Sequence, residues 1–353
     1  MASTLHSLLV VFFSLCPLVF GSTPRYTSQF KPNGVVLPVS KDGATGLYVT
    51  NIKKRTPLLS VPFLVDLNGQ FLWVNCEQHY LSSTYKAPVC HSAQCSRAGN
   101  HYCHKCASPA RPGCHNNTCG VIAQNPLNGR HAISELAQDV LSIQSIQGSK
   151  TGPMVTIPQF IFACAPSFLL QGPLPQNVQG VAGLGHSPVS LPTQLASHFG
   201  FQQKFALCLP SLNKNKPNGA ILFGNLPQNL VPGLDFSNPG TSTPLTIGAQ
   251  GEYYIQVKSI KINNKPVPTN PSILSTNKPT TISTTALYTV LEHSIFQAVT
   301  QFFANELTGV DKVNQVAPFG VCFNSNKLTN SPTGPKVPGT RRVLHTSKIN
   351  KNK

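Results

Sequence analysis

The sequence predicts an all-β protein with two lobes and only a few short helices. Its 353 residues are enough for two domains or for one large two-lobed unit. Many segments are rich in β-branched and aromatic residues, which favour strands. The 31 Pro and 26 Gly residues are spread along the chain instead of gathering in one linker, so they are interpreted as turn residues between strands.

Five segments carry the strand pattern most clearly. They are residues 47–50, 58–67, 140–146, 159–163 and 253–262. Two helices are also predicted. One begins after Ser190, a good N-cap residue with Pro192 in the first turn, and ends near Phe199 before Gly200. The other covers residues 287–307, where apolar side chains recur at spacings of three and four.

Residues 1–21 have the pattern of a secretory signal peptide. Residues 8–20 are nearly all apolar, but this run is too short to cross a membrane comfortably. No later run of about 18 apolar residues exists that could do so. The sequence therefore predicts a secreted protein without a membrane span.

The chain is strongly basic. It has 27 Lys and Arg residues against 10 Asp and Glu residues, for a net charge of +17. Such a surface favours anionic partners, for example a cell-wall polysaccharide or an acidic protein, although charge also simply keeps proteins soluble. Basic residues do not gather with aromatic ones before the tail, so no nucleic acid partner is predicted. Residues 327–353 are basic and almost free of apolar residues, and we expect them to be disordered.

Cysteine spacing indicates a disulfide-rich first lobe. Cys16 lies in the signal peptide, and eight of the remaining cysteines precede residue 165. They are Cys76, Cys90, Cys95, Cys103, Cys106, Cys114, Cys119 and Cys164. In a secreted chain we interpret them as disulfides, with no metal bound. The alternative is a zinc site with His and Cys ligands in residues 101–106. Asn116 begins the sequon Asn116-Asn117-Thr118, which predicts a glycosylated, exposed loop.

One carboxylate is the starting point for any catalytic hypothesis. Asp66 lies in the run 65–74, which resembles the first catalytic loop of a pepsin-like protease. Such an enzyme needs two carboxylates that share one proton. The second loop is expected near residues 281–285, where Ser283 occupies the place of the second Asp and cannot ionise. In addition, bulky Leu67 follows the first Asp where active enzymes have a small hydroxyl residue. We therefore predict no catalytic residues and a structural role for Asp66.

No other acidic residue fits the role of the second carboxylate. After residue 200 the acidic residues are Asp235, Glu252, Glu292, Glu306 and Asp311. None of them precedes a Ser/Thr-Gly pair. The hairpin expected within residues 120–135 contains no Tyr, which active pepsin-like enzymes carry over the substrate. Motifs of serine hydrolases, nucleotide-binding loops and zinc proteases are also absent, so we predict neither enzyme activity nor a cofactor.

Nine runs resemble a plant family of secreted pepsin homologues that have lost protease activity. The family includes xyloglucan-specific endoglucanase inhibitors, extracellular dermal glycoproteins, wheat-type xylanase inhibitors and basic 7S globulin. The runs are residues 36–42, 66–76, 82–85, 111–120, 135–140, 164–170, 181–185, 258–263 and 316–323. The resemblance implies a two-lobed pepsin-like fold in the apoplast or cell wall. It also implies inhibition of a secreted microbial glycoside hydrolase, a xyloglucanase or xylanase, by loop side chains inserted into its active site.

The resemblance also implies a domain division and one disulfide. The expected parts are a signal peptide at 1–21, an N-terminal lobe at 22–228, a partial C-terminal lobe at 229–326 and the basic tail at 327–353. Relatives continue well past Pro338, so the second lobe is expected to be truncated, which would impair inhibition. Cys76 and Cys164 are the implied pair. Cys208 and Cys322 resemble positions that pair within the absent segment, which leaves three alternatives: bonding to each other, remaining free, or linking two chains.

Two other functions stay open at this point. The first is a storage or peptide-binding protein like basic 7S globulin, with a small peptide as partner. The second is an active aspartic endopeptidase, which Ser283 argues against.

Overall fold

The structure is a computed structural model that describes residues 30–100, 102–148, 150–210, 219–225, 243–274, 280–331 and 334–344. The chain divides into two compact units, Met1–Lys31 and Pro32–Lys353, and all the described helices and strands belong to the second. The predicted signal peptide lies outside the described residues. No helix within the described ranges is long and apolar enough to cross a membrane.

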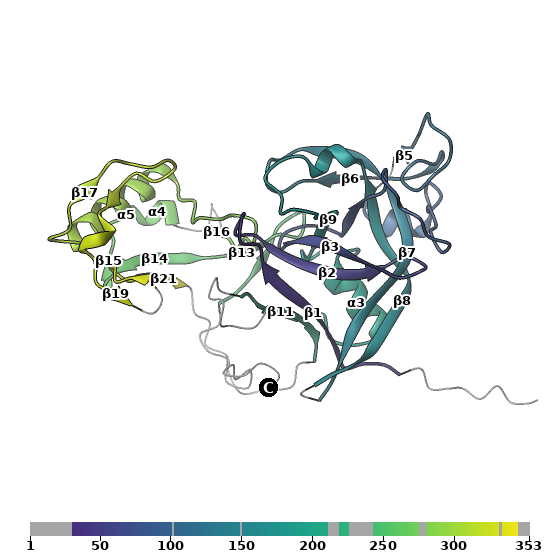
Figure 1. Ribbon diagram of the computed structural model, residues 1–353, viewed down its shortest axis with the longest axis horizontal. Coiled ribbons are helices and arrows are strands. Elements are labelled where there is room, and N and C mark those ends of the chain that lie inside the picture. Colours follow the sequence, from purple (N-terminus) through teal and green to yellow (C-terminus); the bar gives the residue numbers. More distant parts are fainter. Residues whose placement is uncertain are drawn as a thin grey trace, which may run out of the picture. The chain divides into compact units, whose positions relative to one another are not determined.

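An eleven-stranded sheet dominates the described residues up to 225 (Figure 1). Its strands are β1 (Gly34–Lys41), β2 (Tyr48–Lys54), β3 (Leu59–Asp66), β4 (Trp73–Asn75), β5 (Cys103–His104), β6 (Thr118–Gln124), β7 (His131–Gln147), β8 (Lys150–Ala165), β9 (Gly180–Gly183), β10 (Phe205–Cys208) and β11 (Gly219–Gly224). They lie in the order β10-β11-β1-β2-β3-β9-β4-β8-β7-β6-β5. Because β7 also pairs with β1 and β2, the sheet closes on itself.

The predicted all-β class is confirmed, and strands occur in all five predicted segments. The central hairpin is much longer than its sequence pattern indicates. Strands β7 and β8 have 17 and 16 residues and pair from Glu135↔Cys164 to Gln147↔Lys150. They lie side by side in Figure 1. The apolar pattern at 159–163 falls in the buried part of β8, whereas the first half of this strand is largely exposed and gives no such pattern.

The core of this sheet consists of two clusters of buried side chains. Four Phe residues that are inaccessible to solvent anchor the larger cluster: Phe63, Phe160, Phe162 and Phe223. The smaller cluster surrounds Trp73, the only Trp of the sequence. Alternating residues of β1 point inward, as the two-residue period of a strand requires. Burial of this apolar surface is the main source of stability for this part of the chain.

Three short helical segments accompany the large sheet. They are α2 (Ala93–Arg97), η1 (Ser167–Leu170) and α3 (Leu191–Phe199). The prediction for the helix at 190–199 is confirmed. Ser190 is its N-cap and Gly200 its C-cap, with a φ of 76° that an L side chain rarely adopts. The Ser190 hydroxyl donates to the carbonyl of Ser187 and does not bond to a free amide of the helix.

Smaller sheets follow from residue 243 onward. The strands are β12 (Thr246–Ile247), β13 (Tyr253–Ile255), β14 (Val257–Ile262), β15 (Lys265–Pro266), β16 (Thr280–Thr281), β17 (Lys312–Val313), β18 (Cys322–Phe323), β19 (Asn330–Ser331), β20 (Gly334–Pro335) and β21 (Thr340–Leu344). They form the sheets β12-β13-β16, β15-β14-β21, β17-β18 and β19-β20. The helices are α4 (Pro271–Leu274), α5 (His293–Glu306) and η2 (Ser325–Lys327). Ile295 of α5 packs with the apolar residues of β14 in a third buried cluster.

Helix α5 begins later than predicted. The expected range was 287–307, but the helix begins at His293, after Glu292 as N-cap. The carboxylate of Glu292 accepts hydrogen bonds from the amides of Ser294 and Ile295. The apolar spacing of residues 287–291 was therefore misleading, because Leu287 lies on an exposed, non-helical segment.

The prediction that the tail from residue 327 is disordered is wrong for residues 340–344. They form β21, an antiparallel neighbour of β14 with Val257 opposite Leu344 and Ile262 opposite Thr340. The physical reason is that an open edge of β14 offers unpaired backbone groups, and a segment with β-branched residues satisfies them. Lys327 itself forms an ion pair with Asp311. Residues 345–353 lie outside the described residues.

Candidate functional site

Asp66 ends β3 at the floor of a cleft. In the sheet it pairs with Gly183 of β9, and its side chain is buried. Its Oδ1 accepts a hydrogen bond from the amide of Asn68 at 3.0 Å. The surrounding backbone is so close that a Cβ at Gly69 would lie 2.9 Å from the Cα of Gly183 and 3.1 Å from Oδ2 of Asp66. Glycine is therefore required at position 69, as it is beside the Asp of a pepsin-like loop.

The protonation of Asp66 is controlled by its burial. Burial raises the pKa of its carboxyl, while hydrogen bonds from the amides of Asn68 and Gly69 oppose part of this shift. In a catalytic pair the second carboxylate would itself raise the pKa of its neighbour. Among the described residues, the causes of the shift at Asp66 are burial and the two amide hydrogen bonds, and not a neighbouring carboxylate.

The second loop lies directly against the Asp66 loop. Thr284 provides one link: its Oγ1 accepts from the amide of Leu67 at 3.0 Å and donates to the carbonyl of Val65 at 2.8 Å. Asn68 adds a second link, because its Nδ2 donates to the carbonyl of Ile282 at 2.8 Å. Its Oδ1 also accepts from the amide of Tyr253 at 3.1 Å. Threonine and asparagine side chains therefore hold the two loops back to back.

Ser283 points its hydroxyl into its own turn. Its Oγ accepts hydrogen bonds from the amides of Thr285 and Ala286, both at 3.1 Å. It also lies 3.1 Å from Oγ1 of Thr285. A hydroxyl in this position neither ionises at neutral pH nor shares a proton with Asp66. The second loop therefore keeps its position relative to the first without supplying a carboxylate.

The cleft above these loops has a volume of about 810 Å³. Phe71, Trp73 and Ile122 supply apolar walls, while His131 and His186 add polar ones. Among the described residues that line it, the other carboxylate besides Asp66 is that of Glu252, which accepts a hydrogen bond from the amide of Gln250 in its own turn. A cleft of this size and mixed polarity is of the kind that holds a peptide or a small ligand.

A hairpin built from β6 and β7 borders the cleft. It carries no Tyr between residues 120 and 135; Ile122 instead lines the cleft and stands opposite Ile133. The indole Nε1 of Trp73 donates to the carbonyl of Gln124 at 2.9 Å, which ties the hairpin to the cleft floor. The hairpin therefore lacks the phenol hydroxyl that an active pepsin-like enzyme places over its substrate.

The eight cysteines of the first lobe form disulfides. The bonds are Cys76–Cys164, Cys90–Cys103, Cys95–Cys119 and Cys106–Cys114. The first is the pair that the family resemblance implied, and Cys208 and Cys322 are free. The zinc alternative fails on this connectivity, because Cys103 and Cys106 are both oxidised and offer no thiolate. A cluster of Cys90, His91 and Cys103 is excluded for the same reason.

The predicted glycosylation residue is exposed. Asn116 lies on the surface, and its Oδ1 accepts a hydrogen bond from the amide of Cys106 at 2.9 Å. The next residue, Asn117, has a φ of 57°. Thr118, the third residue of the sequon, is buried and donates to Glu135. Glycosylation of Asn116 stays a prediction.

Comparison with family models gives two adjacent matches. Residues 48–225 match the xylanase inhibitor N-terminal family, and residues 252–351 match the xylanase inhibitor C-terminal family. The two matched ranges together include both loops of the cleft.

Comparison with curated proteins gives close relatives from plants. Gamma conglutin 1 of Prunus dulcis is 53% identical over 99% of this chain and 81% of the relative. Basic 7S globulin 2 of Glycine max is 51% identical over 94% of this chain and 80% of the relative. A probable aspartic proteinase named GIP2 from Nicotiana benthamiana is 43% identical over 98% of this chain and 81% of that protein.

Solved structures agree with the fold. The crystal structure of basic 7S globulin from soybean matches with a TM-score of 0.78 and 50% identity, over 90% of this chain and 79% of the other. The crystal structure of edgp matches with a TM-score of 0.83 and 44% identity, over 90% and 81%.

Proposed function

Because the chain belongs to the plant family of pepsin-like proteins that comprises the xylanase inhibitor domains, the basic 7S globulins and the gamma conglutins, we propose that it inhibits secreted microbial glycoside hydrolases and does not cut peptides. The hydrolase class is that of xyloglucanases and xylanases, which degrade plant cell walls. Inhibition works by docking, with the hydrolase active site covered by this chain.

The observation that carries this proposal is the pairing of the two cleft loops. Thr284 holds the second loop against the first, yet the position that faces Asp66 in the family pattern holds Ser283. Acid–base attack of water on a peptide bond needs one carboxylate as base and another as acid. A protein that keeps the scaffold and loses the second carboxylate is suited to binding.

An extracellular location is part of the proposal. Four disulfides among the described residues fit an oxidising compartment, where such bonds persist. The net charge of +17 also fits a protein that meets acidic hydrolase clefts or cell-wall polysaccharide. The N-terminal sequence of the mature protein tests the secretion step, with a start near residue 22 expected.

Inhibition assays with the purified chain test the function. We expect the sugar-releasing activity of at least one xyloglucanase or xylanase to fall and to reach a plateau as the chain is added. The matched control is the same chain after reduction and alkylation, which keeps its basic residues but opens the disulfides. Undiminished activity across a broad panel contradicts the inhibitor proposal.

A storage or peptide-binding role is the second candidate. The observation that favours it is the higher identity to gamma conglutin and basic 7S globulin, 51–53%, against 43% for the probable aspartic proteinase. The cleft of about 810 Å³ has room for a peptide segment. Accumulation of the protein in seed storage tissue, together with inactivity toward hydrolases, is the result that selects this role.

Aspartic endopeptidase activity is the third candidate, and the lone carboxyl of Asp66 opposes it. Digestion of denatured haemoglobin at acid pH is the test, with Asp66→Ala as its control. We expect no cleavage by either form. Cleavage by the wild-type chain that Asp66→Ala abolishes contradicts the proposal that this family member is inactive.

A further inference from the structure

A small disulfide-closed ring lies between β5 and β6 in the chain, outside both cleft loops. It consists of residues 106–114, closed by the Cys106–Cys114 bond, and is called the cysteine ring below. Residues 107–111 are all exposed. Pro109 and Pro112 restrict the backbone on either side of Arg111. The ring therefore presents Arg111 from a segment with few backbone conformations.

Hydrogen bonds within the ring fix its turn. The amide of Arg111 donates to the carbonyl of Cys114 at 3.2 Å, and the amide of Cys114 donates back at 2.8 Å. Gly113, inside this turn, has a φ of 83°, which favours glycine. A Cβ at Gly113 would lie 3.3 Å from Cβ of Cys76 and 3.4 Å from Cβ of Cys164, so the turn packs on the buried disulfide.

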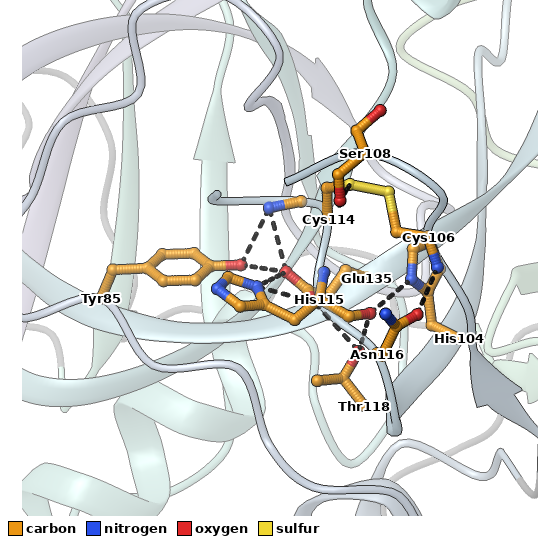
Figure 2. Close-up of a disulfide and its surroundings, with 10 residues drawn as sticks. Tyr85, His104, Cys106, Ser108, Cys114, His115, Asn116, Thr118 and Glu135 are labelled. Atoms are coloured by element: carbon orange, nitrogen blue, oxygen red, sulfur yellow. Dashed lines mark hydrogen bonds and ion pairs between the residues drawn. A yellow bond between two sulfur atoms is a disulfide. The ribbon is translucent and has the colours of Figure 1, made fainter. Parts of the chain in front are cut away.

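A buried carboxylate holds the base of the ring, as Figure 2 shows. Glu135 of β7 is fully buried and accepts hydrogen bonds from the amides of Gly113 and His115, each at 2.9 Å. It also accepts from the hydroxyls of Tyr85 at 2.5 Å and Thr118 at 2.9 Å. A carboxylate with this many donors is rigid, and it transfers that rigidity to the residues that it binds.

Arg111 is exposed, and its charge acts on Glu77. Among the described residues, the ion pairs within 4.0 Å do not include its guanidinium. The pKa of Glu77 is lowered overall: burial raises it, but hydrogen bonds from Ser167 and the charge of Arg111 lower it by more. Glu77 is already bonded to the amide and the hydroxyl of Ser167, at 2.8 and 2.6 Å.

We propose that the cysteine ring is a docking loop in which Arg111 binds two neighbouring carboxylates on an acidic partner protein. The guanidinium offers two parallel N–H donors that match such a pair. The ring is ordered before binding by its disulfide, by its hydrogen-bonded turn and by Glu135. Little conformational freedom is therefore lost on association. The partner rests on the proposed function: glycoside hydrolases carry paired catalytic carboxylates in an open cleft.

Binding and inhibition measured together test the ring. Full-length wild type and Arg111→Glu are immobilised, and a panel of purified xyloglucanases and xylanases is passed over them while activity is assayed in parallel. We expect Arg111→Glu to weaken binding about 30-fold or more, because it removes one charge of an interfacial pair and adds a repulsive one. Arg111→Lys keeps the charge but loses the two parallel N–H donors of the guanidinium. We expect it to weaken binding about 3- to 10-fold.

Two further variants separate the local effect from general charge and from folding. Lys150→Glu changes the net charge equally. Lys150 begins β8 opposite Gln147, at the end of β7 that lies about 40 Å along the strand from Glu135. We expect it to bind within about twofold of the wild type. Cys106→Ser with Cys114→Ser opens the ring and keeps Arg111. We expect about tenfold weaker binding, mainly because the opened loop loses conformational freedom when it binds.

The outcomes separate this inference from the proposed function. If the wild type inhibits a hydrolase and Arg111→Glu inhibits it equally well, the ring proposal is overturned and the proposed function stands. If the wild type binds a hydrolase without inhibiting it, and Arg111→Glu abolishes the binding, the ring proposal stands and the inhibitor function fails. Binding of the wild type to none of the panel overturns both.

Discussion

The described residues up to 225 and those from 243 onward are built on different scales. In the first part, one eleven-stranded sheet encloses two buried clusters and carries four disulfides, as far as the described residues show. In the second part, sheets of two or three strands share one cluster of six buried residues, again counted over the described residues. This difference in core size decides in which part a charged side chain can be buried.

The first part buries even a lysine. Lys54 is almost fully buried, and its Nζ lies 3.1 Å from the centre of the Phe162 ring. Burial lowers the pKa of this amine well below its usual value, an effect that the charge of Asp139 partly opposes. In the second part, by contrast, the buried apolar residues described form one cluster of six, far fewer than in either cluster of the first part. Stability is therefore concentrated in the first part, and the hydrogen bonds of the cleft loops connect the second part to it.

Opening the longest disulfide loop is expected to have the largest effect. Cys76→Ser with Cys164→Ser should reduce the free energy of unfolding by about 4–5 kcal/mol, because the loop it closes spans 88 residues. Urea unfolding followed by the fluorescence of Trp73 measures this in the first part. The control, Cys90→Ser with Cys103→Ser, opens a loop of 13 residues and should cost about 3 kcal/mol. A smaller loss for the long loop than for the short one contradicts the prediction.

A cavity in the second part tests whether the two parts unfold separately. Ile262→Ala truncates a fully buried side chain of β14 and should cost about 2–4 kcal/mol. Hydrogen exchange by mass spectrometry should then show faster exchange in β14 with unchanged protection in β1. The exposed Ile247, changed to Ala, is the control and should alter stability by less than about 0.5 kcal/mol. An equal loss of protection in β1 would mean that the parts unfold as one.

The link between the cleft loops gives a third test. Thr284→Val keeps the side-chain shape but removes the bonds to the amide of Leu67 and the carbonyl of Val65. Two buried backbone groups lose a partner, so we expect a loss of about 1–3 kcal/mol in thermal or urea unfolding. Thr285→Val, next in the chain and less buried, is the matched control and should cost under about 1 kcal/mol. Equal effects of the two variants would show that Thr284 does not hold the loops together.

The smallest effect is expected at Asp66 and depends on pH. Because burial raises its pKa in the folded state above 3.8, the folded chain binds more protons than the unfolded one as the pH rises past that value. The wild type should therefore lose stability with rising pH relative to Asp66→Asn, which can still accept from Asn68. We expect Asp66→Asn to be more stable than the wild type at pH 7, with a difference that vanishes below about pH 3.5. Paired thermal melts across this range measure it, and a gain that persists at low pH contradicts it.

Local signals allowed part of this structure to be predicted. Ser190 and Gly200 mark the ends of α3 because caps depend on residues within one turn. Helix α5 was placed too early because the capping Glu292 is not among the preferred N-cap residues, while the apolar spacing continues before it. Strand β21 was missed since its partner β14 lies about eighty residues earlier in the chain.

The candidate site, too, was predictable from the sequence only in part. The sequence alone determined that the predicted second loop carries Ser283, which cannot ionise, because residue type decides which groups can ionise. Only the tertiary structure decided how those loops meet, through Thr284 and Asn68, and that Glu135 supports the cysteine ring. Chemical character is a property of each residue, whereas a hydrogen bond between residues two hundred positions apart exists only after folding has placed its donor and acceptor together.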